Sequence, residues 1–272
     1  MEFKFSLEDE TFRRDLRQFV KDELPSDWEG GGRWPEETDW DLTREMRKKL
    51  ADKGWLTMHW PEEYGGEKAS PVRSAIFNEE MAYMRAPGRD IFGVRMLGPT
   101  LMIHGSDELK EKHLNAVARG EVQWCQGYSE PESGSDLASL STRAVRDGDE
   151  FIITGRKIWT TLAHRADWIM LLTRTDPDAP KHRGISYIMM QLRDAGKLTE
   201  GITLRPLIDM TGTRRWSEVF FDNVRVPARN LIGEENRGWY VAMTLMDFDR
   251  ASISNTAEDR AQLEVLQDYL GT

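Results

Sequence analysis

The spacing of hydrophobic residues changes twice along the chain, near Val122 and again after Pro227. Before Val122, apolar residues recur at the three-to-four-residue spacing of an amphipathic helix. Between the two points, short apolar runs alternate with turns, and the run RDGDEFIIT carries an Asp-Gly pair typical of a hairpin. Helical spacing then returns. The sequence therefore predicts helical, sheet and helical parts in that order.

These patterns predict an α+β fold. We expect an N-terminal helical domain at 1–120, a middle β-barrel or sandwich domain at 121–230, and a C-terminal helical domain at 231–272. Ser6 is expected to cap the first helix, because a hydroxyl residue stands before several acidic ones. Further helices are expected at 39–53, 71–85 and 108–119.

The C-terminal helical domain is expected to be incomplete. One or two helices bury their own apolar faces poorly, because helical stability in proteins comes mostly from packing against other elements. Unless the first helical domain or another chain covers them, the apolar residues that would lack partners are Val241, Leu245, Phe248, Leu263, Leu266 and Leu270.

Composition removes several classes of function. The 272 residues carry a formal net charge of −10, whereas nucleic-acid binding proteins present basic surfaces. The single cysteine, Cys125, argues against a disulfide framework and a cysteine-based zinc site, and the five histidines show no ligand spacing, so no metal is expected. No signal peptide and no membrane span are apparent. We expect a cytoplasmic protein.

Two segments have an unusual composition. QGYSEPESGSD (126–136) presents the hydroxyls of Ser129, Ser133 and Ser135, and Gly134 permits close backbone approach by a ligand. Such a loop can offer N–H groups and hydroxyls to a pyrophosphate or to the edge of a heterocycle. Taken alone, a polar loop between strands explains it more simply.

The second segment is KIWTTLA (157–163). Trp159 can lie against a flat ring, while Thr160 and Thr161 can donate hydrogen bonds to its heteroatoms. Threonines are also ordinary strand residues, and that simpler explanation fits the segment when it is considered alone.

Six motifs occur together and in a fixed order along the chain. They are WPEEYGG (60–66), GPTLMIHGSDELKEKHL (98–114), SEPESGSD (129–136), GRKIWTT (155–161), SEVFFDNVRVP (217–227) and GWYVAM (238–243). Together they resemble the acyl-CoA dehydrogenase family throughout the chain. The resemblance implies FAD as cofactor, an acyl-CoA thioester as substrate, and desaturation of its α,β carbons. It also implies electron-transfer flavoprotein as electron acceptor and a homo- or hetero-oligomer.

The resemblance also implies roles for individual residues. Ser129 matches a hydroxyl that contacts the isoalloxazine ring, Thr161 matches a residue near N5, and Ser135 matches one that also approaches the CoA arm. Asp247 and Arg250 match a stretch that touches substrate. The full set of cofactor-binding residues implied in this way is Gln126, Gly127, Tyr128, Ser129, Gly134, Ser135, Trp159, Thr160 and Thr161.

The sequence departs from the family pattern at two points. Glu132 replaces a glycine of the family's EPGAGSD loop, and a glutamate would be strained there if that backbone φ were positive. The usual catalytic glutamate of the C-terminal domain has no counterpart here. In a minority of members the base lies at the position of Asp249, although Asp249 could instead pair with a neighbouring arginine.

The chemistry itself agrees with the resemblance. Desaturation of a thioester needs a base for the α proton and an acceptor for the β hydride, and a buried carboxylate suits the first role. Two other functions stay open on the sequence. One is a non-catalytic subunit that pairs with an active homologue, and the other is a flavin oxidase or monooxygenase of the same fold.

Overall fold

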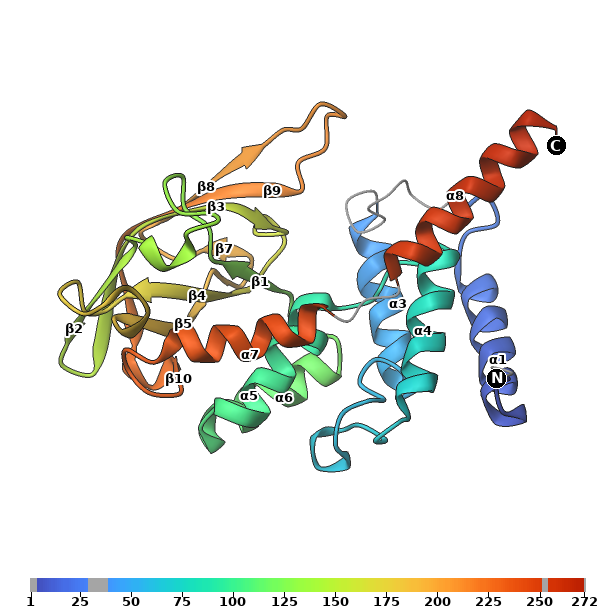
Figure 1. Cartoon of the computed structure of the whole chain (residues 1–272), viewed down its shortest axis with the longest axis horizontal. Helices are drawn as coiled ribbons and strands as arrows, with labels where there is room; N and C mark the ends of the chain where they lie inside the picture. Colours follow the sequence, from blue (N-terminus) through green and yellow to red (C-terminus); the bar gives the residue numbers. More distant parts are fainter. Residues whose placement is uncertain (1–3, 29–38, 251–253, 272) are drawn as a thin grey trace. The chain divides into compact units, whose positions relative to one another are not determined.

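The computed structural model describes residues 4–28, 39–250 and 254–271 (Figure 1). The chain divides into two compact units, which we call the helical unit and the sheet unit. The helical unit comprises Met1–Arg89, Ala118–Gly120 and Arg250–Thr272, and the sheet unit comprises Asp90–Val117 and Glu121–Asp249. No helix in the described ranges is long and apolar enough to cross a membrane.

Within its described residues the helical unit contains four α-helices, of which the first three have side-chain N-caps. The four are α1 (Leu7–Glu23), α3 (Trp40–Asp52), α4 (Pro71–Tyr83) and α8 (Ser254–Leu270), with a short 3-10 turn η1 (Glu62–Tyr64) between α3 and α4. Ser6 caps α1 in a reciprocal capping box with Asp9, which confirms the predicted start of the first helix. Ser70 caps α4 by accepting a hydrogen bond from the Arg73 N–H.

A buried carboxylate joins α1 to α4. Glu80 is almost fully buried, and it accepts hydrogen bonds from the guanidinium groups of Arg13 and Arg17 one turn apart on α1. The Arg17 Nε atom lies 2.5 Å from Glu80 Oε2. Charge-assisted bonds of this kind are stronger than neutral ones and fix the register of the two helices.

In the sheet unit, helical segments occur before the first strand, between strands and after the last strand. Its helical segments are η2 (Ile91–Leu97), α5 (Gly98–His104), α6 (Asp107–Ala118), η3 (Leu137–Ser139), η4 (Lys181–Arg183), η5 (Ala228–Asn230) and α7 (Gly238–Arg250). Val241 and Leu245 of α7 are buried within this chain, so these two residues do not need a further helix or another chain to cover them. The side chain of Phe248 lies outside the described part of the structure. Leu263, Leu266 and Leu270 of α8 are exposed, as expected.

One curled sheet of eight strands organises the sheet unit. Its strands are β1 (Trp124–Gly127), β2 (Arg143–Asp147), β3 (Glu150–Thr161), β4 (Trp168–Arg174), β5 (Ile185–Gln191), β8 (Ile202–Leu207), β9 (Trp216–Pro227) and β10 (Leu231–Ile232), and a separate hairpin joins β6 (Arg193–Asp194) to β7 (Lys197–Leu198). The order is β10-β5-β4-β2-β3-β9-β8, with β1 parallel to β4. Asp147 pairs with Glu150 around Gly148 at φ 65°, so the predicted hairpin is confirmed.

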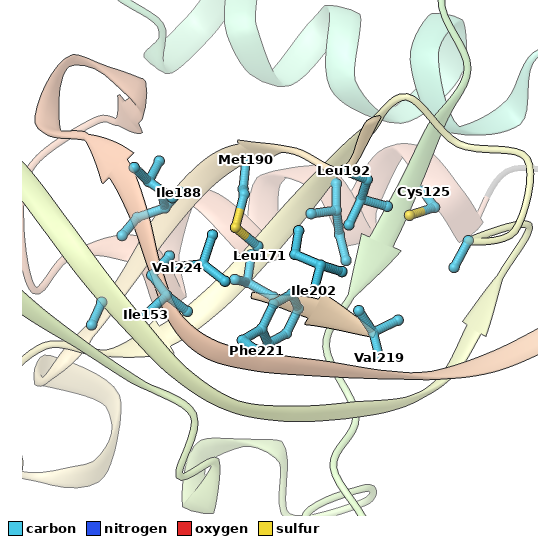
Figure 2. Close-up of a cluster of buried hydrophobic side chains, with 14 of the residues drawn as sticks. Cys125, Ile153, Leu171, Ile188, Met190, Leu192, Ile202, Val219, Phe221 and Val224 are labelled. Carbon is cyan, nitrogen blue, oxygen red and sulfur yellow. The ribbon is translucent and has the colours of Figure 1, made fainter. Parts of the chain in front are cut away.

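The expected α+β class is confirmed, with a helical part followed by a β part. The sheet does not close into a barrel: in the described residues its hydrogen-bonded path ends at β8 on one side and at β10 on the other. Between its strands lies a cluster of buried apolar side chains (Figure 2). Side chains of seven strands contribute to this core, among them Cys125, Ile153, Leu171, Met190 and Phe221.

A fully buried ion pair links the end of β1 to β3. The Lys157 ammonium donates a hydrogen bond to Glu130 Oε1 at 2.8 Å, and neither side chain is appreciably exposed. Burial alone would raise the pKa of Glu130, but the charge and hydrogen bond of Lys157, with the hydroxyl and backbone donors of Thr142 and Ser141, lower it to about 2. Burial lowers the pKa of Lys157 to about 8, against the opposing pull of Glu130.

We expect Glu130 to contribute to stability only above strongly acidic pH. Its pKa falls from 4.5 to about 2 on folding, so its contribution is complete above 4.5 and is lost as the pH falls toward 2. We expect Glu130→Gln to lower the free energy of unfolding by roughly 2–3 kcal/mol at neutral pH, and to flatten the acid limb of the stability curve.

Urea unfolding followed by circular dichroism across this pH range measures both effects. Glu132→Gln is the matched control, because Glu132 is exposed and lies two positions further along the same turn. Equal loss of stability in the two variants, or an unchanged acid limb in Glu130→Gln, would contradict the prediction.

Candidate functional site

The two segments that stood out in the sequence meet in the sheet unit. The Ile158 N–H donates to the Ser129 carbonyl at 2.9 Å, and the Lys157 ammonium donates to the Tyr128 carbonyl at 3.0 Å. One segment follows β1, and the other forms the end of β3. The loop after β1 is therefore held directly against the last residues of β3.

A β-bulge lies at this junction and determines how Trp159 is presented. Lys157 pairs with Val219 of β9, whereas Thr160 pairs with Ser217, so β3 carries one more residue than β9 between these pairs. Trp159 occupies the bulge with φ 59°, in the left-handed region that large side chains rarely adopt. Its side chain is 60% exposed, and its ring meets the ring of Trp216 edge-on at 6.4 Å. Strained residues cluster at ligand and active sites, so the exposed indole of Trp159 is a candidate ligand contact.

Buried polar atoms without hydrogen-bond partners lie in the same strands. Among the described residues they include Gln126 Nε2 on β1, Thr160 Oγ1 on β3 and Ser217 Oγ on β9. Thr160 and Ser217 are direct partners across the β3–β9 ladder. A buried polar group without a partner costs free energy, and a bound ligand is one way to satisfy it.

The loop after β1 is a tight turn with room beside it. Glu130 and Ser133 exchange backbone hydrogen bonds of 2.9 and 3.0 Å, so Pro131 and Glu132 form the tip of the turn. Glu132 is absent from the described residues with positive φ, so the strain anticipated for a glutamate there does not arise. A Cβ atom added at Gly134 would meet no heavy atom within 4 Å. The backbone at Gly134 is thus open to close approach.

Two of the predicted residues are positioned by packing. A Cβ on Gly127 would lie 2.7 Å from Ile169 Cδ1 and 2.8 Å from Leu171 Cδ1, so the core itself requires this glycine. Tyr128 is buried, and its hydroxyl donates to the Tyr187 hydroxyl at 3.1 Å. The Tyr128 side chain is buried and Gly127 has none, so each residue offers only its backbone to a ligand.

The remaining predicted residues have different surroundings. Ser129 and Thr161 are half-buried, and Ser135 is exposed. Asp247 is exposed on α7. Asp249 and Arg250 complete α7, but their side chains lie outside the described part of the structure. In the described residues, no group of three or more His, Cys, Asp or Glu side chains could hold a metal ion.

Four residues of this region were missed by sequence reasoning. Glu130, Lys157 and Ser217 lie inside the six motifs but were not assigned a role, and Trp216 directly precedes one of them on β9. A charged residue in the middle of a β-strand, such as Lys157 in GRKIWTT, is a signal for a buried partner. The pairing of β9 with β3 has no local signal, because it depends on the tertiary arrangement.

Two models of one protein family match most of the chain. Residues 6–121 match the family model described as acyl-CoA dehydrogenase, N-terminal domain, and residues 125–224 match the acyl-CoA dehydrogenase, middle domain. Acyl-CoA dehydrogenase IpdE1 of Mycobacterium tuberculosis is 37% identical over 246 residues, which are 89% of this chain and 63% of that protein. FadE34 of the same organism is 41% identical over 85% of this chain, but the match covers 32% of its own length.

Solved structures show the same relationship. The complex described as "Tcur3481-Tcur3483 steroid ACAD" matches all of this chain and 68% of its own, with a TM-score of 0.87 and 35% identity. The ChsE4-ChsE5 complex from Mycobacterium tuberculosis matches 91% of this chain and 61% of its own, with a TM-score of 0.80 and 35% identity. The chain thus spans about two thirds or less of the relatives it matches, and over that span it belongs to the acyl-CoA dehydrogenase family.

Proposed function

We propose that this protein is an FAD-dependent acyl-CoA dehydrogenase that desaturates a thioester between its α and β carbons. The observation that carries the proposal is the junction of the two segments, where an exposed, strained Trp159 lies beside strands with unsatisfied buried polar atoms. Family membership supplies the reaction class.

The residues at the junction fit a flavin. Trp159 offers a flat indole surface to a ring system. Thr160 Oγ1 and Gln126 Nε2 are buried polar atoms that need partners, and the heteroatoms of an isoalloxazine ring are suitable ones. Ser129 and Thr161 contribute further hydroxyls, while Gly134 and Ser135 leave open backbone for a ligand arm. When bound, FAD would supply the hydride acceptor.

The protein has to supply orientation and a base for the α proton. We propose Asp249 for the base, with Asp247 and Arg250 beside it for substrate contact, because these three residues fall together at the end of α7. A carboxylate in this role must reach the α carbon, and aspartate is one methylene shorter than glutamate. The alternative is a glutamate outside these 272 residues, in the portion of the relatives that this chain does not match.

The relatives suggest a substrate class and an assembly. The Tcur3481-Tcur3483 structure is described as a steroid ACAD, and it and the ChsE4-ChsE5 complex each name two different components, so we propose a bulky acyl-CoA and a hetero-oligomeric assembly for this protein. Electron-transfer flavoprotein is the proposed electron acceptor, and the cytoplasm is the proposed compartment. An oxidase is the second candidate, because the prolyl acyl carrier protein oxidase AnaB is 26% identical with a TM-score of 0.79.

We expect the purified chain mixed with FAD to form a yellow complex whose flavin absorbance bleaches when an acyl-CoA is added without oxygen. Absorbance spectra under anaerobic conditions measure this, with straight-chain and steroid-bearing thioesters compared in parallel. Rapid return of the colour in air with formation of peroxide would favour the oxidase. A chain that binds flavin but responds to no thioester alone or with a homologous subunit would contradict the proposed reaction.

We expect Trp159→Gly to separate flavin binding from folding. Glycine relieves the left-handed strain while the contact with Trp216 is lost, so the free energy of unfolding should change by less than about 1 kcal/mol. Loss of a stacking surface should weaken FAD binding about tenfold or more. Thermal unfolding and fluorescence titration with FAD measure the two quantities.

Met210→Ala is the control for this substitution. Met210 is a fully exposed large apolar side chain of the same unit outside both segments, so its removal should leave the FAD dissociation constant unchanged. Unchanged FAD binding in Trp159→Gly would remove Trp159 from the proposed site.

A further inference from the structure

A single cation joins the two sides of the junction described above. Lys157 lies on β3 two residues before Trp159, and its ammonium donates to the Tyr128 carbonyl at 3.0 Å and to Glu130 Oε1 at 2.8 Å. Both acceptors belong to the loop after β1. The lysine is completely buried, which is rare for this residue unless it is paired.

The carboxylate that receives this cation is anchored elsewhere too. Glu130 Oε2 accepts hydrogen bonds from the Ser141 N–H at 2.6 Å and from the Ser141 hydroxyl at 2.8 Å, and Oε1 accepts from the Thr142 N–H at 2.9 Å. Ser141 and Thr142 lead into β2. Lys157 and Glu130 therefore connect three stretches of backbone: the exit from β1, the entry to β2, and the part of β3 that precedes the bulge.

The hydrogen bonds of Lys157 fix the orientation of the loop after β1, which apolar packing alone would not do. A hydrophobic residue at position 157 would keep the segments together, but it would leave the Tyr128 carbonyl and the Glu130 carboxylate without their donor. The Ile158 N–H bond to the Ser129 carbonyl follows directly in the chain. The position of the loop relative to Trp159 thus depends on the ammonium group.

We propose that Lys157 is a positioning residue for the cofactor: its charged ammonium holds residues 128–130 in the arrangement that binds flavin, so FAD affinity depends on the charge of Lys157. This inference rests on the proposed flavin function. Lys157 itself need not touch the cofactor, because it acts through the backbone of Tyr128 and Ser129.

The two pH dependences, of stability and of FAD affinity, distinguish a positioning role of Lys157 from a purely structural one. The charged groups that act on it are Glu130, from the loop after β1, and Arg174, at the end of β4. Its pKa falls from 10.5 to about 8 on folding, so between these values the unfolded chain holds more protons and the contribution of Lys157 to stability rises with pH. A positioning role predicts the opposite trend for FAD affinity, which falls as Lys157 loses its charge.

The test measures FAD affinity of the 272-residue chain by fluorescence titration from about pH 7 to about pH 9.5, with circular dichroism at each pH. For the natural sequence we expect the dissociation constant to rise about tenfold over this range while the fold is retained. For Lys157→Met we expect binding at least about tenfold weaker at pH 7 and a pH dependence of less than about twofold.

Arg13→Met is the matched control. Arg13 is also a buried cation paired with a buried carboxylate, Glu80, but it lies in the helical unit. This variant should lose stability and keep the FAD dissociation constant and pH profile of the natural chain.

The outcomes are distinct. Failure of the natural chain to bind FAD would overturn the proposed function and this inference together. Flavin binding with a dissociation constant that is flat with pH, or equal in Lys157→Met, would overturn the positioning role alone. If Lys157→Met fails to fold, the pH profile of the natural chain decides between the two.

Discussion

The ion pair between Glu130 and Lys157 is the interaction on which the candidate site depends. Removing two charges from water is expensive, and a pair of this kind is retained only where further hydrogen bonds satisfy both groups. Here Ser141, Thr142 and the Tyr128 carbonyl provide them. Apolar residues of similar volume could have filled the same space with no loss of stability. The pair differs from apolar packing because its directional hydrogen bonds fix the loop after β1 against β3.

The left-handed backbone at Trp159 persists because the residues on both sides of it are held in place. A large residue at φ 59° costs on the order of 1–3 kcal/mol, and the backbone keeps that conformation only where its surroundings leave no alternative. Lys157 is held on one side of Trp159, and the ladder from Thr160 to Ser217 resumes on the other. Trp159 thus takes the left-handed conformation between two anchored positions of β3. The side chain that results is turned outward, where a planar ligand can reach it.

Sequence reasoning could predict the order of elements, because hydrophobic spacing and capping residues are local signals. Ser6 and the Asp147-Gly148 turn are examples that the structure confirms. It could also single out the two segments that the structure brings together. It could not predict that Gly127 serves the core, that Glu132 sits without strain, or that Val241 is buried. Each of these depends on neighbours far away in sequence, such as Ile169, or on a backbone angle that residue types do not determine.

Alternation along β1 shows how one strand can serve both the core and the site. Cys125 and Gly127 face the apolar core, and Gln126 faces the other side with a buried amide nitrogen that lacks a partner. A shift of one residue in the pairing with β4 would exchange these faces, which would bury the amide in the core. The apolar core therefore sets the register, and the register sets which polar groups are left for a ligand. The ion pair then orients the loop that continues from the same strand, so packing and positioning act on consecutive residues.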